Sequence, residues 1–185
     1  MRPFSIFSLS IIPFYNYTIY RMNSLFMFMS KLIFPILPET RCFGFKRFLL
    51  RLSGANIGKN VRICSSAHFS GSGKIQIGAD TWIGHESMII ASSNVYIGAC
   101  VDIAPRVYIG TGTHKIDING ERIAGEGISE DIVIDDGAWL CAGCIILPGV
   151  TIGRKSIIAA GAVVNKDVMS KCVYAGVPAK NVKTL

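Results

Sequence analysis

A six-residue period runs through most of this chain. In the longest run the aliphatic residues recur at Ile134, Leu140, Ile146, Ile152, Ile158 and Val164. Three upstream runs keep the same step and are displaced from one another by insertions: Ile57 and Ile63, then Ile77, Ile83 and Ile89, then Ile97, Ile103 and Ile109. An α-helix would space its apolar residues three and four apart, and a free-standing strand would alternate every two. The period instead predicts a solenoid of short strands and corners.

A second regular position supports this interpretation. The fourth residue after each aliphatic residue is small or valine, at Val61, Ala67, Thr81, Ser87, Ser93, Val101, Val107, Thr113, Ala138, Cys144, Val150, Ser156, Ala162 and Val168. Each unit thus offers one large and one small inward residue. A unit of six residues cannot bury its own apolar face, so successive units must coil and stack their aliphatic residues in columns.

The repeated units of the type [Ile/Leu/Val]-Gly-x-x-x-x, closed by "YAGVPAKNVK", resemble the hexapeptide-repeat acyltransferases over roughly residues 37–185. The resemblance implies a mainly β fold, a left-handed parallel β-helix with three units per triangular turn. We expect an apolar and basic N-terminal helical segment over 1–52, the β-helix over 53–170 with a projecting loop at 115–131, and a C-terminal tail over 171–185.

The N-terminal segment carries most of the excess charge. The chain has a formal net charge of +7, and the residues up to Arg51 include seven basic side chains and one acid, Glu39. The nearly neutral repeat region argues against nucleic-acid binding. No charge occurs from Pro3 to Tyr20, and "FKRFLLRL" has the pattern of a basic amphipathic helix. Three interpretations stay open: helices that lie on a membrane with Lys and Arg reaching anionic headgroups, a helical cap over the open end of the β-helix, and a contact between subunits.

The cysteines fit the repeat. Cys64 and Cys141 follow an aliphatic position, and Cys144 takes a small inward position, so they are interpreted as packing residues and "CAGC" as neither a redox pair nor half a zinc site. Reduced cysteines and the absence of a signal cleavage pattern predict a cytoplasmic protein, at the inner face of the cell membrane if the N-terminal segment binds lipid.

The longest interruption of the period marks the expected active site. The polar, glycine-bearing stretch "KIDINGERIAGEGISEDI" separates His114 from the next aliphatic run. Loops that project from a solenoid commonly carry its function. His68 and His85 lie within or beside repeat units, and we interpret both as surface or structural residues.

The residues 112–150 around this stretch resemble the branch of the family that O-acetylates sugars of capsules, lipopolysaccharide O-chains and related surface glycans. The resemblance implies that His114 is the general base for direct transfer from acetyl-CoA to a sugar hydroxyl, with no metal and no acyl-enzyme. A neutral imidazole can take the proton of the attacking hydroxyl, because its pKa lies near working pH. Asp117 and Asp102 are candidates for orienting the ring.

The resemblance also implies a homotrimer with acetyl-CoA in the grooves between neighbouring subunits. The matching cofactor positions are Trp139, Ala142, Gly143, Ala160, Gly161 and Lys180. Tiny residues would let the pantetheine arm approach the backbone, the indole would wall it, and the lysine would face the nucleotide phosphates.

Other functions remain as alternatives. An amino-sugar N-acetyltransferase and a serine acetyltransferase-like enzyme share the fold, and a non-catalytic β-helix scaffold would lack acetyl-CoA binding. A zinc hydratase related to γ-class carbonic anhydrases would need three histidine ligands including a close pair, whereas the three histidines here are spaced far apart.

Overall fold

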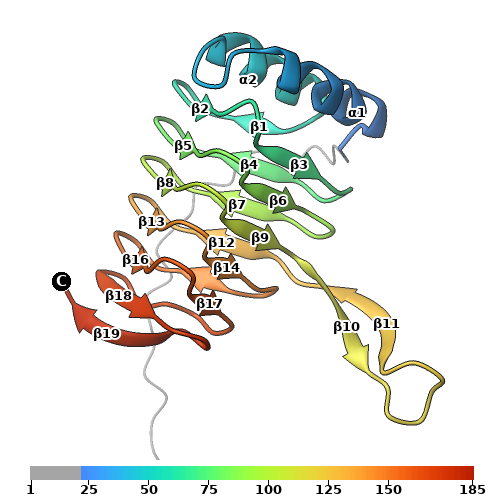
Figure 1. The fold of residues 1–185 in the computed structure, drawn as a ribbon, viewed down its shortest axis with the longest axis vertical. Helices are drawn as coiled ribbons and strands as arrows, with labels where there is room; N and C mark the ends of the chain where they lie inside the picture. The colour runs from blue at the N-terminus through green and yellow to red at the C-terminus, as the bar shows by residue number, and fades with distance from the viewer. Residues whose placement is uncertain (1–21) are drawn as a thin grey trace, which may run out of the picture.

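The computed structural model describes residues 22–185, and three parallel sheets wound into a triangular β-helix form its body (Figure 1). In the β-helix, consecutive strands along the chain belong to the first, second and third sheet in turn. Each strand therefore pairs with the strand that occupies the same sheet one turn later. None of the helices in residues 22–185 has the length and apolarity needed to cross a bilayer.

The strands of the first sheet are ordered β1 (Asn56–Ile57), β4 (Ile75–Ile77), β7 (Val95–Ile97), β12 (Ile132–Ile134) and β15 (Thr151–Ile152). The second sheet is ordered β2 (Arg62–Ile63), β5 (Trp82–Ile83), β8 (Asp102–Ile103), β13 (Trp139–Leu140), β16 (Ile157–Ile158), β18 (Cys172–Ala175) and β19 (Lys180–Thr184). The third is ordered β3 (His68–Ser70), β6 (Met88–Ile90), β9 (Tyr108–Gly110), β14 (Ile145–Ile146) and β17 (Val163–Val164). All neighbours in these sheets are parallel except β18 and β19, which are antiparallel.

The six-residue columns form the core as predicted. Ile83, Ile103 and Leu140 stack in consecutive strands of the second sheet and are each 0 % exposed. Polar residues at the small inward positions are satisfied locally: the Thr81 hydroxyl donates to the Gly98 carbonyl, and the Ser87 hydroxyl to the Ala104 carbonyl. Apolar burial thus supplies the driving force, and within residues 22–185 no buried side-chain hydroxyl lacks a hydrogen-bond partner.

Two of the fourteen small positions were predicted wrongly. Ser93 is half-buried and Thr113 is exposed, whereas Ala91 and Thr111 are fully buried at the same corner. An insertion follows each of these two positions. The last inward residue before each insertion is therefore Ala91 or Thr111, two residues earlier than the six-residue period predicts. The wall resumes with Val95, which pairs with Ile75.

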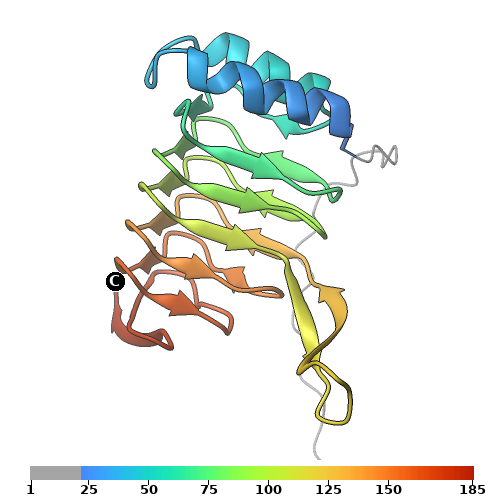
Figure 2. The same ribbon diagram turned by 45° about the vertical axis from the view of Figure 1, so that its right-hand side comes forward.

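Two helices cover the first coil, α1 (Ser24–Ile33) and α2 (Phe43–Leu52), joined through the short 3-10 helix η1 (Phe34–Ile36) (Figures 1 and 2). The Asn23 side chain caps α1 by accepting from the amides of Leu25 and Phe26. Met27, Phe34 and Leu50 are buried in the core.

Cationic side chains of α2 satisfy the unpaired carbonyls of the first coil. Lys46 is 0 % exposed and its ammonium donates to the carbonyls of Pro38, Glu39 and Ile63. Arg47 donates to the Val61 carbonyl, and Arg51 to those of Ile57 and Gly58. These cations therefore point into the β-helix, as the capping interpretation requires, and do not face outward toward lipid headgroups.

Candidate active site

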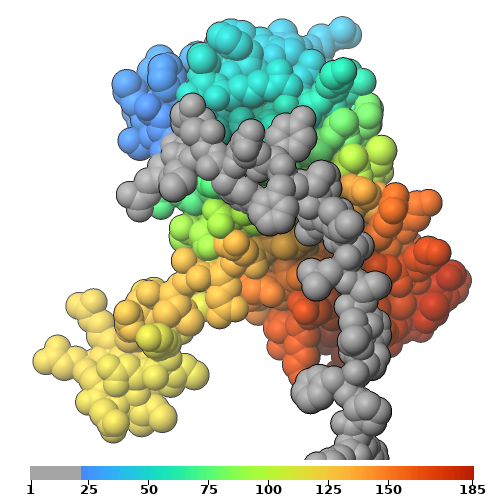
Figure 3. All heavy atoms as spheres, turned by 180° about the vertical axis from the view of Figure 1, so that it is seen from behind, coloured from blue at the N-terminus to red at the C-terminus, as the bar shows by residue number. Residues whose placement is uncertain are grey.

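The long insertion that follows β9 is an antiparallel hairpin that projects from the body of the β-helix (Figures 2 and 3). Its strands are β10 (Gly112–Ile116) and β11 (Ala124–Ser129), and they form a two-stranded sheet of their own. Every residue of β10 is exposed. The hairpin begins before His114, so the histidine lies on the projecting strand itself, opposite Gly127.

The base of the hairpin is tied to the wall. The Thr111 carbonyl accepts from the Glu130 amide at 2.9 Å, and the Thr111 hydroxyl accepts from the Ser93 amide at 2.9 Å. The Asp131 carboxylate accepts from the Ser93 hydroxyl, the Asn94 amide and the Asn94 side chain. Burial opposes ionisation of Asp131, but these hydrogen bonds outweigh it and hold the pKa of its carboxyl below its usual value. Both ends of the hairpin are therefore fixed at one corner.

The backbone of the hairpin orients the His114 ring. Its Nδ1 lies 2.9 Å from the carbonyl oxygen of Gly125. A carbonyl oxygen can only accept, so Nδ1 carries the proton of the bond. In the neutral imidazole the other nitrogen, Nε2, then has a free lone pair. This is the tautomer that a general base requires.

An open pocket of about 360 Å³ lies at this histidine. It is lined by Ser92 on the wall and by Gly112, Thr113, His114, Gly127, Ile128 and Ser129 on the hairpin. A β-carbon added to Gly127 would sit 4.0 Å from Cε1 of His114. Glycine at this position keeps the space beside the ring open.

Within this chain the bond to the ring comes from neither of the two carboxylates predicted to orient it. Asp117 accepts from the amides of Asn119 and Gly120 and so shapes the turn of the hairpin. Asp102 lies on β8, where it is in register with Trp82 and Trp139 on the outer face of the second sheet. Gly125, which the sequence did not single out, supplies the contact to Nδ1.

Four of the predicted cofactor residues lie at one corner, between the second and third sheets. The Gly143 amide donates to the Pro105 carbonyl, and the Gly161 amide to the Ala142 carbonyl, each at 3.0 Å. Gly143 and Gly161 both have φ of +67°, and a β-carbon at either would meet nothing within 4 Å. Glycine is thus favoured for its left-handed backbone, and the corner is open to solvent. Ala142 and Ala160 are exposed beside them.

Trp139 and Lys180 complete the predicted set on the second sheet. Trp139 starts β13 and leaves 49 % of its surface exposed. Lys180 starts β19, is exposed, and is in register with Ala175. In the view of Figure 1, β13 and the hairpin lie at opposite edges of the body, so one chain does not bring Trp139 and the hairpin together.

Comparison with known proteins decides the family. The sequence model described as bacterial transferase hexapeptide (six repeats) matches residues 131–166. Galactoside O-acetyltransferase of Escherichia coli is 33 % identical over 137 residues, which are 74 % of this chain and 67 % of that protein. A protein assigned in Escherichia coli as the colanic acid biosynthesis acetyltransferase WcaF is 33 % identical over 147 residues, 80 % of this chain and 78 % of that protein. The chain belongs to the hexapeptide-repeat acetyltransferase family.

A solved structure agrees with this membership. A hexapeptide-repeat acetyltransferase of Vibrio cholerae, complexed with acetyl coenzyme A, superposes with a TM-score of 0.72 at 29 % identity and covers 87 % of this chain and 86 % of that one. The chain spans 56 %, 67 % and 63 % of the length of the first three curated relatives it matches. The mainly β fold with N-terminal helices is the one that the sequence predicted.

Sequence reasoning missed three residues that position the hairpin. Gly125 acts through its carbonyl, which leaves no side-chain signal. Ser93 was taken for an inward packing residue, although its hydroxyl bonds Asp131. Asp131 is the last residue of the insertion before β12, and a carboxylate at that junction was the available signal.

Proposed function

We propose that the protein is an acetyl-CoA-dependent O-acetyltransferase that acts on a sugar hydroxyl of a surface polysaccharide or its precursor. The observation that carries this proposal is the contact between His114 Nδ1 and the Gly125 carbonyl, at 2.9 Å, beside an open pocket. The named activities of the two Escherichia coli relatives, on a galactoside and in colanic acid biosynthesis, support a sugar acceptor.

The proposed transfer is direct. His114 Nε2 takes the proton of the acceptor hydroxyl as its oxygen attacks the thioester carbonyl carbon of acetyl-CoA. The tetrahedral intermediate then collapses with cleavage of the carbon–sulfur bond, and the imidazolium returns the proton to the departing CoA thiolate. The Gly125 carbonyl stabilises the imidazolium between these steps and keeps Nε2 aimed at the acceptor.

The acetyl-CoA site that we propose runs along the corner between the second and third sheets, where Gly143 and Gly161 lie. An open path is left there by four small residues, Ala142, Gly143, Ala160 and Gly161. Trp139 packs against the pantetheine arm, and Lys180 faces the phosphates. The acetyl coenzyme A bound to the Vibrio cholerae relative supports this co-substrate.

Because the hairpin and Trp139 lie at opposite edges of one chain, we propose that the active site is completed by a neighbouring subunit. A cyclic threefold assembly would place the hairpin of each protomer against the corner of the next protomer. The homotrimer then carries equivalent sites, each built from two subunits.

The test of the base is His114→Asn, measured as CoA release with a panel of galactosides and maltose as acceptors. Transfer should fall roughly 10²–10⁴-fold, the usual contribution of a general base, while acetyl-CoA affinity and the fold stay unchanged. His68→Asn, an exposed histidine on β3, is the matched control and should keep activity within a few-fold. Near wild-type transfer by His114→Asn would overturn the proposal.

If no acceptor in the panel is acetylated, mass spectrometry of surface glycans from cells with and without the gene identifies the substrate. An acetyl group missing from a glycan hydroxyl supports O-transfer. An acetyl group missing from an amino sugar nitrogen supports the N-acetyltransferase alternative.

We further propose that the outer face of the helix pair contacts a lipid surface. Half of the large hydrophobic side chains exposed in residues 22–185 lie on α1, η1 and α2: Leu25, Phe26, Phe28, Met29, Leu32, Ile36, Phe45, Phe48 and Leu52. The uncharged stretch Pro3–Tyr20 lies a few residues before them in the sequence, separated by Arg21. The cationic side chains of α2 donate to carbonyls of the first coil of the β-helix. We therefore propose that the contact is made by insertion of apolar side chains into the lipid, and not by pairing of the α2 cations with headgroups.

Sedimentation with phosphatidylcholine vesicles tests the contact. The full chain should pellet with these vesicles, which carry no net charge, because exposed apolar side chains drive the binding. A Leu25→Ser, Phe28→Ser, Leu32→Ser variant should stay in the supernatant. Ile116→Ser with Ile118→Ser, exposed on the hairpin, is the control and should pellet like wild type. Equal pelleting of the α1 variant would contradict the contact.

A further inference from the structure

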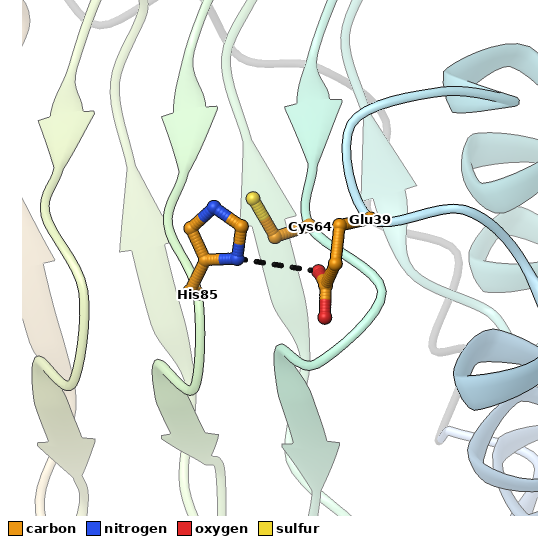
Figure 4. Close-up of side chains that lie close together, drawn as sticks. All are labelled: Glu39, Cys64 and His85. Carbon is orange, nitrogen blue, oxygen red and sulfur yellow. Dashed lines mark ion pairs between the residues drawn. The ribbon is translucent and has the colours of Figure 1, made fainter.

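A second cluster of chemically active side chains lies far from the hairpin, where the helix cap meets the first coils of the β-helix. Glu39 follows η1, Cys64 follows β2, and His85 follows β5 on the next turn (Figure 4). One donor atom of each lies within 4.8 Å of the others, and His85 Nδ1 is 3.4 Å from Glu39 Oε2. Within residues 22–185 this is the one place where at least three potential metal-ligand side chains converge in this way.

The backbone that carries two of these residues is held by a buried lysine. Lys46 donates to the Glu39 carbonyl at 2.7 Å and to the Ile63 carbonyl, directly before Cys64, at 3.0 Å. Its third bond goes to the Pro38 carbonyl, so its donors are directed at backbone oxygens and not at the Cys64 sulfur. The loop with Glu39 and the corner with Cys64 are therefore fixed relative to each other.

The Glu39 side chain is also held in place. Its Oε2 accepts from the Ser66 amide and the Ser66 hydroxyl, each at 3.2 Å. The side chains of Glu39 and His85 are 45 % and 44 % exposed, which gives an ion a route from solvent, while Cys64 is buried behind them. Two half-exposed ligands, of which Glu39 is held by Ser66, thus lie over the buried Cys64.

We propose that Glu39, Cys64 and His85 form a binding site for a thiophilic divalent cation, of which Zn²⁺ fits best. A sulfur, a ring nitrogen and a carboxylate oxygen are the donors that Zn²⁺ takes in proteins, and three protein ligands leave a fourth position for water. Tetrahedral coordination needs ligand atoms about 3.5 Å apart, given typical Zn–ligand lengths. The pair at 3.4 Å already meets this spacing, and the exposed side chains can close the rest.

The charges of the site suit a dication. A Glu39 carboxylate and a Cys64 thiolate would neutralise the ion. Burial raises the pKa of the Cys64 thiol to about 11, so the metal itself must displace the thiol proton when it binds. The site is separate from the proposed transfer chemistry, because it lies at the opposite end of the solenoid from Gly161 and Lys180. An ion there would fasten the loop between α1 and α2 to two successive turns of the β-helix.

Cobalt substitution of the full chain tests the site. One equivalent of Co²⁺ should give a near-ultraviolet thiolate-to-cobalt band with the visible spectrum of tetrahedral cobalt, and Zn²⁺ should displace it. Cys64→Ser should abolish the thiolate band. Cys141→Ser, a partly exposed cysteine outside the cluster, is the control and should leave the spectrum intact.

His85→Asn tests the site without changing the core, because its side chain is half exposed. It should weaken Co²⁺ binding by more than the roughly 10–100-fold that losing an outer-shell partner costs. Circular dichroism of each variant separates ligand loss from unfolding. A wild-type protein without the thiolate band, an unchanged band in folded Cys64→Ser, or unchanged Co²⁺ affinity in folded His85→Asn would overturn the proposal.

Discussion

The wall of the β-helix and the hairpin that leaves it are stabilised in opposite ways. Ile109, the middle residue of β9, is 0 % exposed and stacks between Ile89 and Ile146 of the adjacent turns. Ile116 and Ile118, a few residues later, are 78 % and 82 % exposed. The wall is held by burial, whereas the hairpin is held by hydrogen bonds at its base. A change of stability and a change of activity can therefore be separated by choosing the region.

The wall should give the largest effect on stability. Ile109→Ala removes buried methyl groups from a column that cannot collapse, and should lower the free energy of unfolding by about 2–5 kcal/mol. Denaturant unfolding of the variant measures this. A loss below 1 kcal/mol would show that the column is loosely packed.

The hairpin base should give an intermediate effect, expressed in activity more than in unfolding. Asp131→Asn replaces an exposed carboxylate that accepts three hydrogen bonds, whose contribution to stability is reduced by solvent screening. Misplacement of His114 should lower transfer roughly 10-fold or more. Hydrogen exchange at the Asn94 and Glu130 amides should speed up in the variant. Unchanged exchange would show that Thr111 alone fixes the hairpin.

The pH dependence of this anchor has a definite sign. The pKa of Asp131 is lowered in the folded protein, so its contribution is fully present above the ordinary aspartate pKa and is lost as pH falls through the lowered value. Protection of the Asn94 amide should therefore persist through the neutral range and fall only in acid. Asp131→Asn should remove this acid step.

The hairpin surface should give the smallest effect on stability. Ile118→Ala trims a side chain that is 82 % exposed, so the free energy of unfolding should change by no more than about 0.5 kcal/mol. The same substitution that is severe at Ile109 is thus almost silent here. A large loss in the assembled protein would mean that Ile118 is buried against another subunit.

The regularity of the sequence explains how much of this structure could be predicted. The geometry of the β-helix repeats with every turn, so its buried residues recur at a regular spacing in the sequence. The positions of Ile83, Ile103 and Leu140 could therefore be predicted. His114 was predicted from the interruption of that regularity and from the resemblance around it. Its partner Gly125 could not be, because a backbone carbonyl has no sequence signature. The convergence of Glu39 with Cys64 and His85 was also hidden, since it depends on how the helix cap lies on the first coils.

Residues at corners were the least predictable. Ser93 and Thr113 stand at the positions where the six-residue period predicts an inward residue, but neither is buried in the β-helix. An insertion at each place changes which residue turns inward. Within one chain the Gly125 carbonyl bonds the His114 ring, and Asp117 bonds the amides of its own turn, so the orienting roles of Asp117 and Asp102 stay predictions.

Subunit complementation tests the central claim, that a hairpin of one protomer serves the acetyl-CoA corner of its neighbour. Ala160→Trp fills the proposed corner and His114→Asn removes the proposed base, so trimers of either variant alone should be inactive. Co-expression in equal amounts should restore about one quarter of wild-type activity, because one site in four then combines an intact hairpin with an intact corner. Mixed trimers that stay inactive, or a well-folded active monomer in light scattering, would contradict the account.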